Sequence, residues 1–520
     1  MADIIVGIDA GTSVIKAVAF ADDGRQLGVA AEPNVYQRVG DGGYEQDPAE
    51  TWTKTAAVLR RLAESVPDLG RRTLAIAVTG QGDGTWLIDD AGTPTAPGWL
   101  WLDARAAALA DRRRALPEDR ERFLITGTGF AACQMGAQLA YMDETMPGLL
   151  DRSATAFHCK DWLYFLMTGR RATDPTEGLF TFGSYRTLAY SDEVVRLLGL
   201  SHRRGLLPEI VDGTRQYDPL SERAAAEIGI PAGTPVVLAY VDALCTCVGG
   251  GLYDPDCSTG LTIIGSTGLH VALVDGADKV RLNPDSTGWT MKFPVPGFYA
   301  QLQSNMAATL NIDWLLDLAV DVLASAGVRR SRADQLIGID DLVLGAAPGR
   351  ILYQPHISDA GERGPFVDPH ARAGFVGLDS GHRYADLMRA VFEGLALAAR
   401  NCYGAMGPLP GEIRVSGGAA RSVALRQIIG AAVGASVRGG GREEAGAAGA
   451  AMMAAVCLGV YPDMAACADA WVGPWLGALE PPDPALTEVY ARLYPAYVGA
   501  QRAMIPIWRQ LAEARGAADA

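Results

Sequence analysis

The hydrophobic pattern at the start of the chain is that of a β-hairpin. The apolar run Ile4–Ile8 precedes a short Gly/Thr/Ser segment, and a second apolar run, Val14–Phe20, follows it. Two such runs joined by a tight turn predict antiparallel strands. A third run, Leu27–Ala31, comes next, and Pro48 then opens an amphipathic segment with Trp52 on its apolar face. Antiparallel strands followed by helices predict an α/β fold with a mixed sheet.

The same pattern returns in the second half of the chain. The apolar run Leu261–Ile264 leads into the turn Gly265–Gly268, and Leu269–Leu273 resumes the apolar pattern. An internal repeat of this kind predicts two similarly built domains that face a shared cleft, with one turn on each side. Gly249–Gly251 is the most evident candidate for the hinge between them.

Other apolar runs end in polar or glycine-rich segments. Three of them, Leu74–Thr79, Pro235–Val241 and Ile413–Ser416, are predicted to be strands. In α/β proteins, ligand-binding groups lie beyond the ends of such strands. Asp143–Thr155 and Asp161–Thr168 are predicted to be helices.

Length and composition describe an ordinary globular protein. The 520 residues exceed what one hydrophobic core usually supports, so two domains are expected. The formal charge of −15 disfavours nucleic acid or an anionic membrane as the main partner. The eight cysteines are scattered, which favours reduced thiols over disulfides or a zinc site. The first strand begins almost at once, and no apolar run reaches about 18 residues, so a cytoplasmic protein is expected.

A carboxylate and several phosphate-binding groups meet at the tip of the first hairpin. Asp9 ends the first strand, and Gly11, Thr12 and Ser13 form the turn. Glycine lets a bulky anion approach the backbone, and the hydroxyls and amides suit phosphate oxygens. An acid would repel a phosphate, so Mg²⁺ held through oxygen ligands is the expected mediator. The turn matches neither a Walker A loop nor a G-x-G-x-x-G fingerprint, and an ordinary hairpin turn is the alternative.

Two later segments combine polar groups with aromatic residues. In the loop 80–86, Gln81 and Asp83 lie among three glycines, a composition that excludes a helix. In the segment 99–105, Trp101 lies close to Asp103. Aromatic faces bind the CH surface of a polyhydroxyl compound and polar groups bind its hydroxyls, so these segments are predicted to hold a sugar or polyol.

Asp242 repeats the setting of Asp9, because it also follows an apolar strand. A charged group in such apolar surroundings is seldom structural without a partner. Sites of this kind often shift the pKa of the group. A catalytic carboxylate is therefore one interpretation of Asp242. An N-cap for the helix that follows is the alternative.

Taken in order, these motifs resemble those of the FGGY carbohydrate kinases, a branch of the actin, hexokinase and heat-shock ATPase superfamily. The resemblance begins at Gly7–Ser13, with Lys16 after it, and extends to about Tyr494. It implies a two-domain actin/hexokinase-like (ribonuclease H-like) fold with a cleft between the domains, and phosphoryl transfer from ATP with Mg²⁺. It places an N-terminal FGGY domain at 1–250, a C-terminal FGGY domain at 251–480 and a helical extension at 481–520.

The resemblance also implies a role for each motif. Asp242 is the expected general base, and Asp9 is the expected catalytic residue that positions the metal. The implied substrate-binding residues are Gln81, Asp83, Trp101, Asp103 and Asp242. The implied nucleotide-binding residues, from two phosphate motifs and one adenosine motif, are Gly11, Thr12, Ser13, Lys16, Gly265, Ser266, Thr267, Gly268, Gly417, Gly418, Ala419 and Gln427. Ala419 departs from the family pattern, which usually has a third glycine there.

The substrate loop narrows the choice of substrate. After the equivalent of Gln81, xylulose kinases usually carry Met-His and glycerol kinases carry Arg-Glu, whereas this chain has Gly82 and Asp83. Within the family, the N-terminal run with residues 80–86 is most similar to that of the erythritol kinases. This implies phosphorylation of a terminal hydroxyl of erythritol, with xylulose, ribulose, xylitol or another short polyol as alternatives.

Two functions of other classes compete with a kinase. A chaperone-type ATPase of the superfamily would need a peptide-binding domain, and no spare segment of the chain is large enough for one. A non-catalytic, sugar-responsive ATP-binding protein could lose Asp9 or Asp242, yet both acids are present. Dimers are common among similar enzymes, so the resemblance implies a homodimer as the expected assembly.

Overall fold

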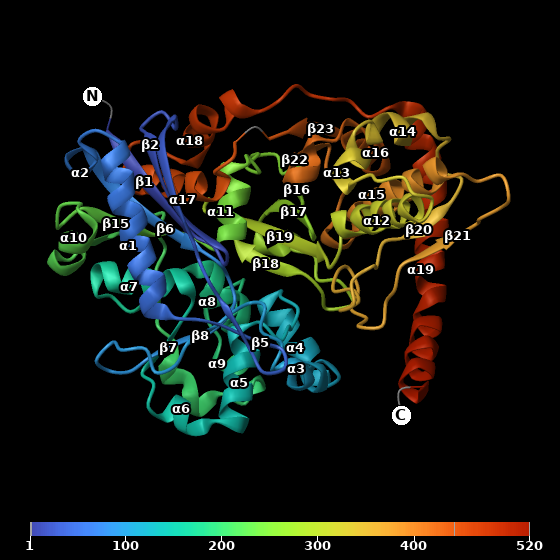
Figure 1. Cartoon of the computed structure of the whole chain (residues 1–520). Coiled ribbons are helices and arrows are strands. Elements are labelled where there is room, and N and C mark those ends of the chain that lie inside the picture. The colour runs from blue at the N-terminus through green and yellow to red at the C-terminus, as the bar shows by residue number, and fades with distance from the viewer. Residues whose placement is uncertain (1–2, 441, 519–520) are drawn as a thin grey trace.

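The computed structural model describes residues 3–440 and 442–518, and two six-stranded sheets form its framework (Figure 1). The first sheet has the strand order β14-β15-β6-β1-β2-β3, and the second has the order β18-β19-β17-β16-β22-β23. The strands of the first sheet are β1 (Ile4–Ala10), β2 (Val14–Ala21), β3 (Gln26–Pro33), β6 (Thr73–Gly80), β14 (Asp218–Pro219) and β15 (Pro235–Leu238). Those of the second sheet are β16 (Thr259–Ile264), β17 (Gly268–Asp275), β18 (Trp289–Lys292), β19 (Phe298–Asn305), β22 (Glu412–Ser416) and β23 (Ser436–Gly439).

Five strands of each sheet share one topology, and the sixth strands, β14 and β18, lie at opposite edges. In the first, β1, β2 and β3 are antiparallel, and β6 and β15 run parallel to β1. In the second, β16, β17 and β19 are antiparallel, and β22 and β23 run parallel to β16. The internal repeat predicted from the two hairpins is therefore confirmed, as is a mixed α/β fold. Asp9 pairs with Lys16 in the first hairpin, which puts residues 11–13 at its tip.

Two helices pack against each other between the sheets. They are α11 (Asp242–Gly249), after β15, and α17 (Ala445–Cys457), after β23, so they occupy equivalent places in the repeat. Their backbones meet at glycines, because a Cβ on Gly249 would lie 2.0 Å from the carbonyl oxygen of Ala445. Likewise, a Cβ on Gly449 would lie 1.9 Å from the carbonyl oxygen of Cys245. The predicted hinge at 249–251 thus begins inside this packed helix pair.

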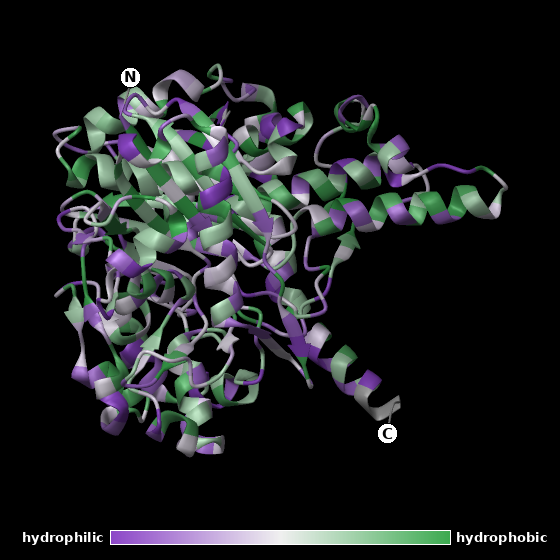
Figure 2. Ribbon diagram, turned by 60° about the vertical axis from the view of Figure 1, so that its left-hand side comes forward, coloured by the Kyte–Doolittle hydropathy of each residue, from purple (hydrophilic) through white to green (hydrophobic). Residues whose placement is uncertain are grey.

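Amphipathic helices cover the outer faces of both sheets. The first sheet packs on α1 (Pro48–Ser65), α7 (Cys159–Thr168) and α10 (Glu222–Ile228). The second packs on four helices, α12 (Thr309–Ser325), α15 (Tyr384–Met406), α16 (Val423–Val433) and α19 (Pro484–Ala518). Green and purple alternate along the peripheral helices in Figure 2, as expected for amphipathic helices. The end of α19 extends away from the rest of the molecule in both views (Figures 1 and 2).

One predicted helix is wrong. The segment Asp143–Thr155 is divided among α5 (Met135–Thr145), α6 (Pro147–Asp151) and the start of β9 (Thr155–Phe157). Pro147 cannot donate a backbone hydrogen bond to the preceding turn, so α5 ends before it and a new helix begins with it. The other predicted helix in this part of the chain, Asp161–Thr168, is confirmed as the body of α7.

The remaining elements are short and connect this framework. They are α2 (Leu69–Arg72), α3 (Ala107–Arg114), α4 (Pro117–Thr126), α8 (Pro175–Phe182), α9 (Asp192–Leu197), α13 (Arg332–Leu336), α14 (Ile339–Gly345), α18 (Met464–Trp471), β4 (Gln37–Val39), β5 (Gly43–Gln46), β7 (Trp86–Ile88), β8 (Gly98–Trp99), β10 (Ala172–Thr173), β11 (Gly183–Ser184), β12 (Ala189–Tyr190), β13 (Glu209–Ile210), β20 (Leu352–Gln354) and β21 (Gly374–Val376).

Candidate active site

The Thr12 hydroxyl joins the first turn to the predicted substrate segments. Its Oγ1 donates to Gln81 Oε1 (2.8 Å) and accepts from Trp101 Nε1 (2.8 Å). Gln81 Nε2 donates to Gln46 Oε1 (2.7 Å), and Gln46 Nε2 donates to the Thr12 carbonyl oxygen (2.8 Å). The structure therefore brings together one residue predicted to bind phosphate and two predicted to bind substrate. Gln46 was not predicted; it completes the hydrogen-bonded ring.

Asp9, the last residue but one of β1, and Asp242, the first residue of α11, lie near each other. Burial, reinforced by the nearby charge of Asp9, raises the pKa of Asp242 to about 7. Burial also raises the pKa of Asp9 to about 6, although the Lys16 ammonium opposes that shift. The N-cap residue of α11 is Val241, and Asp242 is the first residue within the helix. The N-cap alternative for Asp242 is therefore wrong.

The start of α17 lies against Asp9. A Cβ on Gly446 would be 2.6 Å from Asp9 Oδ2, so only glycine leaves room for the carboxylate there. Glu444, which precedes the helix, accepts from Lys16 Nζ (2.8 Å). Lys16 thus pairs with an acid from the far end of the chain. The glycine- and alanine-rich run of α17 is the sequence signal for this close packing, but it does not indicate the partner.

The donor set around Asp9 fits a metal ion carried by a nucleotide. Among the described residues there is no group of three or more His, Cys, Asp or Glu that could hold a metal by itself. Mg²⁺ commonly binds through one or two protein carboxylates and the phosphate oxygens of a nucleotide. The half-buried Asp9, next to the turn at 11–13, supplies a carboxylate of this kind.

The second hairpin turn and the adenosine motif also meet. Gly417 has φ +89°, and a Cβ on it would lie 2.5 Å from the carbonyl oxygen of Ile264, the last residue of β16. The carbonyl oxygens of Gly265 and Ser266 accept from Thr309 N (3.0 Å) and Ala308 N (2.7 Å), which anchors the turn to the start of α12. The other predicted residues of these motifs lie in the turn, at the start of β17, in the short helix after β22, or on α16: Thr267, Gly268, Gly418, Ala419, Gln427.

Asp83 and Asp103 differ in how the protein uses their carboxylates. Asp83 has φ +55°, and its Oδ2 accepts from Cys133 Sγ (3.4 Å), whereas its buried Oδ1 accepts no hydrogen bond from any residue that the structure describes. Asp103 accepts from Tyr44 N (2.9 Å) and from the Arg105 side chain, also through Oδ2 (2.6 Å). Because Asp103 is occupied within the protein, its contact with substrate stays a prediction, and Asp83 is the more available acid.

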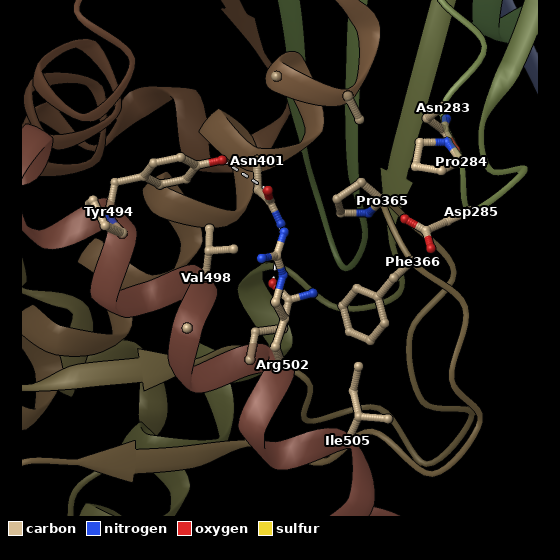
Figure 3. Close-up of a pocket in the computed structure, with 15 residues that line it drawn as sticks. Asn283, Pro284, Asp285, Pro365, Phe366, Asn401, Tyr494, Val498, Arg502 and Ile505 are labelled. Atoms are coloured by element: carbon tan, nitrogen blue, oxygen red, sulfur yellow. Dashed lines mark hydrogen bonds between the residues drawn. The ribbon is translucent and has the colours of Figure 1, made fainter.

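Two surface hollows lie away from this cluster or at its edge. One, of about 710 Å³, lies between α15, α19 and the loops at 283–285 and 365–366, where Tyr494 donates to Asn401 (2.9 Å) (Figure 3). None of the predicted site residues is among the described residues that line it. The other, of about 770 Å³, is lined by Cys133, Trp289 and Arg363 among others, and so reaches the side chain that contacts Asp83.

Residues 4–249 match the N-terminal domain of the FGGY family of carbohydrate kinases, and residues 260–458 match its C-terminal domain. The chain belongs to this family. It is accordingly a carbohydrate kinase, a phosphotransferase with an alcohol group as acceptor.

Curated relatives extend over almost the whole chain. Erythritol kinase of Brucella abortus (strain 2308) is 52% identical over 513 residues, which cover 99% of this chain and 98% of that protein. Xylulose kinase of Escherichia coli (strain K12) is 26% identical over 82% of this chain and 84% of that protein. Glycerol kinase of Dechloromonas aromatica (strain RCB) is 28% identical over 90% of this chain and 91% of that protein.

Solved structures show the same fold. The xylulose kinase from Rhodospirillum rubrum superposes with a TM-score of 0.87 at 25% identity, covering 97% of this chain and 100% of that one. The Plasmodium falciparum glycerol kinase with ADP has a TM-score of 0.83 at 17% identity, covering 96% of this chain and 98% of that one. This carbohydrate kinase therefore has the two-sheet, actin/hexokinase-like fold of FGGY sugar kinases. No helix within the described residues is long and apolar enough to cross a membrane.

Proposed function

We propose that this carbohydrate kinase transfers the terminal phosphoryl group of ATP to a terminal hydroxyl of erythritol. The observation that carries the proposal is the 52% identity to an erythritol kinase over 99% of the chain. The xylulose and glycerol kinases named above are 26% and 28% identical, so they support the alternatives only at the level of the family.

In the proposed reaction, Asp242 accepts the proton of the attacking hydroxyl. A pKa of about 7 suits this role, because a general base works best when its pKa lies near the operating pH. The Thr12 hydroxyl and the backbone amides of the two hairpin turns stabilise charge on the transferred group. In phosphoryl transfer, positioning and electrostatic stabilisation provide most of the catalysis.

The remaining predicted residues hold the reactants. Asp9 would hold Mg²⁺, which neutralises charge on the phosphate oxygens when bound. Gln81, Asp83 and Trp101 bind the polyol, and the glycine turn at 417–419 provides a surface for the adenine base. The division at residues 250 and 480 is part of the proposal, as are a homodimer and a cytoplasmic location.

The test is ATP consumption by the purified protein with Mg²⁺ on erythritol, xylitol, glycerol, D-xylulose and L-ribulose. Erythritol should give the highest kcat/KM, and Asp242→Ala should abolish that turnover. A matched control is Asp192→Ala, because Asp192 is also the first residue of a helix, α9, and its side chain is exposed. A higher kcat/KM on another member of the panel would overturn the choice of erythritol. Binding of ATP and polyol without product would favour the non-catalytic, sugar-responsive alternative.

A further inference from the structure

A buried acid, Glu177, lies directly behind the predicted substrate loop. α8 carries it, and its side chain is fully buried. Neither of its carboxylate oxygens accepts a hydrogen bond in the part of the chain that the structure describes. Its neighbour is His158, whose Nε2 lies 3.4 Å from Glu177 Oε2 and likewise has no hydrogen-bond partner.

Glu177 reaches the loop because residue 82 has no side chain. A Cβ on Gly82 would lie 2.8 Å from Glu177 Oε1 and 2.4 Å from Cγ2 of Val241, the residue before Asp242. Gly82 itself is half-buried, and Asp83 is the next residue of the loop. The Glu177 carboxylate therefore lies against the loop backbone next to Asp83, and near the residue that precedes the predicted base.

The neighbouring acid Asp161 differs from Glu177 in its hydrogen bonds. Asp161 accepts from His158 Nδ1 (3.0 Å), from His158 N (3.0 Å) and from Lys160 Nζ (2.8 Å), so both of its oxygens are satisfied. Glu177, equally buried, has no such donors. Buried polar groups are nearly always hydrogen-bonded, and an unpaired one is unfavourable. Within the described residues, the protein thus satisfies both oxygens of Asp161, whereas Glu177 has His158 Nε2 at 3.4 Å as a charged neighbour but accepts no hydrogen bond.

Three neighbouring side chains have unsatisfied polar atoms here: Asp83 Oδ1, His158 Nε2 and both oxygens of Glu177. Burial raises the pKa of Glu177 to about 8, while the nearby charges of His158 and Lys160 oppose that shift. A polyol hydroxyl both donates and accepts, so it complements acids and imidazole in either protonation state.

We propose that Glu177 hydrogen-bonds a polyol hydroxyl other than the one that Asp242 deprotonates, and so helps to determine which polyol is accepted. His158 positions the Glu177 carboxylate from behind, and Gly82 gives the hydroxyl access to it. The inference rests on the proposed function, because it requires a polyol in this site.

The experiment compares Glu177→Ala and Glu177→Gln with the wild-type protein. Calorimetry gives the Kd for erythritol without ATP, and steady-state assays give KM and kcat. Loss of one hydrogen bond to a buried acid should raise Kd and KM about tenfold or more in Glu177→Ala, with kcat changed less than about threefold. Glu177→Gln keeps the shape and a hydrogen-bonding head group, so its effect should be smaller.

A matched control is Thr181→Val on the same helix, since Thr181 is also buried and its hydroxyl also has no hydrogen-bond partner. A Cβ on Gly136 would contact Thr181, so this side chain faces α5 instead of the substrate loop. Thr181→Val should leave Kd and KM unchanged. If it raises them as much as Glu177→Ala does, the effect comes from α8 packing and the inference is overturned.

Analogues that lack one internal hydroxyl sharpen the test. The wild-type protein should bind erythritol more tightly than either enantiomer of 1,2,4-butanetriol. Glu177→Ala should lose that preference for at least one enantiomer, a result that a purely structural role would not produce. An unchanged preference, or a wild-type Kd in Glu177→Ala, contradicts the inference. Should Glu177→Ala fail to fold, Glu177→Leu, which keeps most of the volume but has no hydrogen-bonding group, is measured on the same analogues by the same criterion.

The two proposals can fail separately. If the wild-type protein phosphorylates another polyol and not erythritol, the proposed function fails, and the same variants and controls are measured on that polyol. If the wild-type protein phosphorylates erythritol and Glu177→Ala binds it normally, only the role of Glu177 fails.

Discussion

The two hairpin turns have the same place in the repeat but are held in different ways. The first follows β1, whose last two residues are Asp9 and Ala10, and side chains connect its Thr12 to Gln81 and Trp101. The second follows a strand that ends in Ile264, and backbone carbonyls connect it to the start of α12. Side-chain networks fix reacting groups, whereas backbone turns leave room for a phosphate or a flat base. The repeated fold thus provides two turns that are predicted to bind phosphate, and an acid lies beside only the first.

α11 and α17, the helices that follow β15 and β23, also differ between the two halves of the repeat. Asp242 begins α11, and its pKa is raised to about 7, mainly by burial. Glu444 precedes the equivalent helix α17, but Lys16 neutralises it at 2.8 Å. Among the described residues, the acid of one half therefore has no ion pair and is the predicted base, whereas the acid of the other half is in an ion pair.

The largest expected effect comes from removing the free acid. Asp242→Asn keeps the shape of the side chain but cannot accept the proton, so kcat should fall about 10²- to 10⁴-fold, the usual contribution of a general base. Glu444→Gln, at the equivalent place in the repeat, should lower kcat less than about tenfold, because it breaks one partly exposed ion pair. Steady-state kinetics measure kcat for both variants and so test this difference. Equal losses would remove the distinction between the two halves.

The pH profile should report the same acid. Asp242 acts only when deprotonated, so kcat should rise with pH through about 7. Below that midpoint, kcat should fall about tenfold per pH unit. Because a cation near Asp9 favours the charged form of Asp242, more Mg²⁺ should move the midpoint to lower pH. A profile that is flat between about pH 5 and 8 would rule out Asp242 as the titrating base.

A smaller effect is expected from a substitution at Gly417, in the glycine turn of the second half of the repeat. In Gly417→Ala, the new Cβ would lie 2.5 Å from the Ile264 carbonyl oxygen at φ +89°. Strain of about 1–2 kcal/mol should displace the loop and raise the KM for ATP about tenfold. Gly418→Ala is the matched control, because a Cβ there meets nothing within 4 Å. ATP titrations of both variants test this, and a larger change in the control would contradict it.

The smallest effect concerns the side-chain network of the first turn. Trp101→Phe removes the hydrogen bond from Nε1 to Thr12 Oγ1 (2.8 Å) at an exposed site. Loss of one such bond should raise the KM for the polyol about two- to tenfold and leave kcat nearly unchanged. Thr12→Ser retains the hydroxyl and should behave like the wild-type protein in the same assay. If Thr12→Ser raises the KM for the polyol as much as Trp101→Phe does, the hydrogen bond to the Thr12 hydroxyl does not explain the effect.

Local pattern was enough to predict the framework. Alternating apolar runs and glycine turns predict both hairpins, and the structure confirms them. The strand-end position of Asp9 follows from the same pattern, because a polar residue after a buried run marks where a strand leaves the sheet. The strand predicted to reach Val241 is three residues too long, because β15 ends at Leu238 and Asp242 begins α11. The predicted helix at 143–155 is wrong for an equally local reason, the proline at 147.

Contacts between distant segments were decided by the tertiary structure alone. Thr12 and Gln81 are 69 residues apart, and Lys16 and Glu444 are 428 residues apart, yet each pair is hydrogen-bonded. The contact between Glu177 and Gly82 is also of this long-range kind, since nothing near Glu177 in the sequence indicates that Gly82 lies against its carboxylate. Periodicity records which face of an element is buried, so the sequence by itself determined the strands and the positions of their terminal acids. Which acid is paired and which stays free depends on how the helices pack, and only the folded chain decides that.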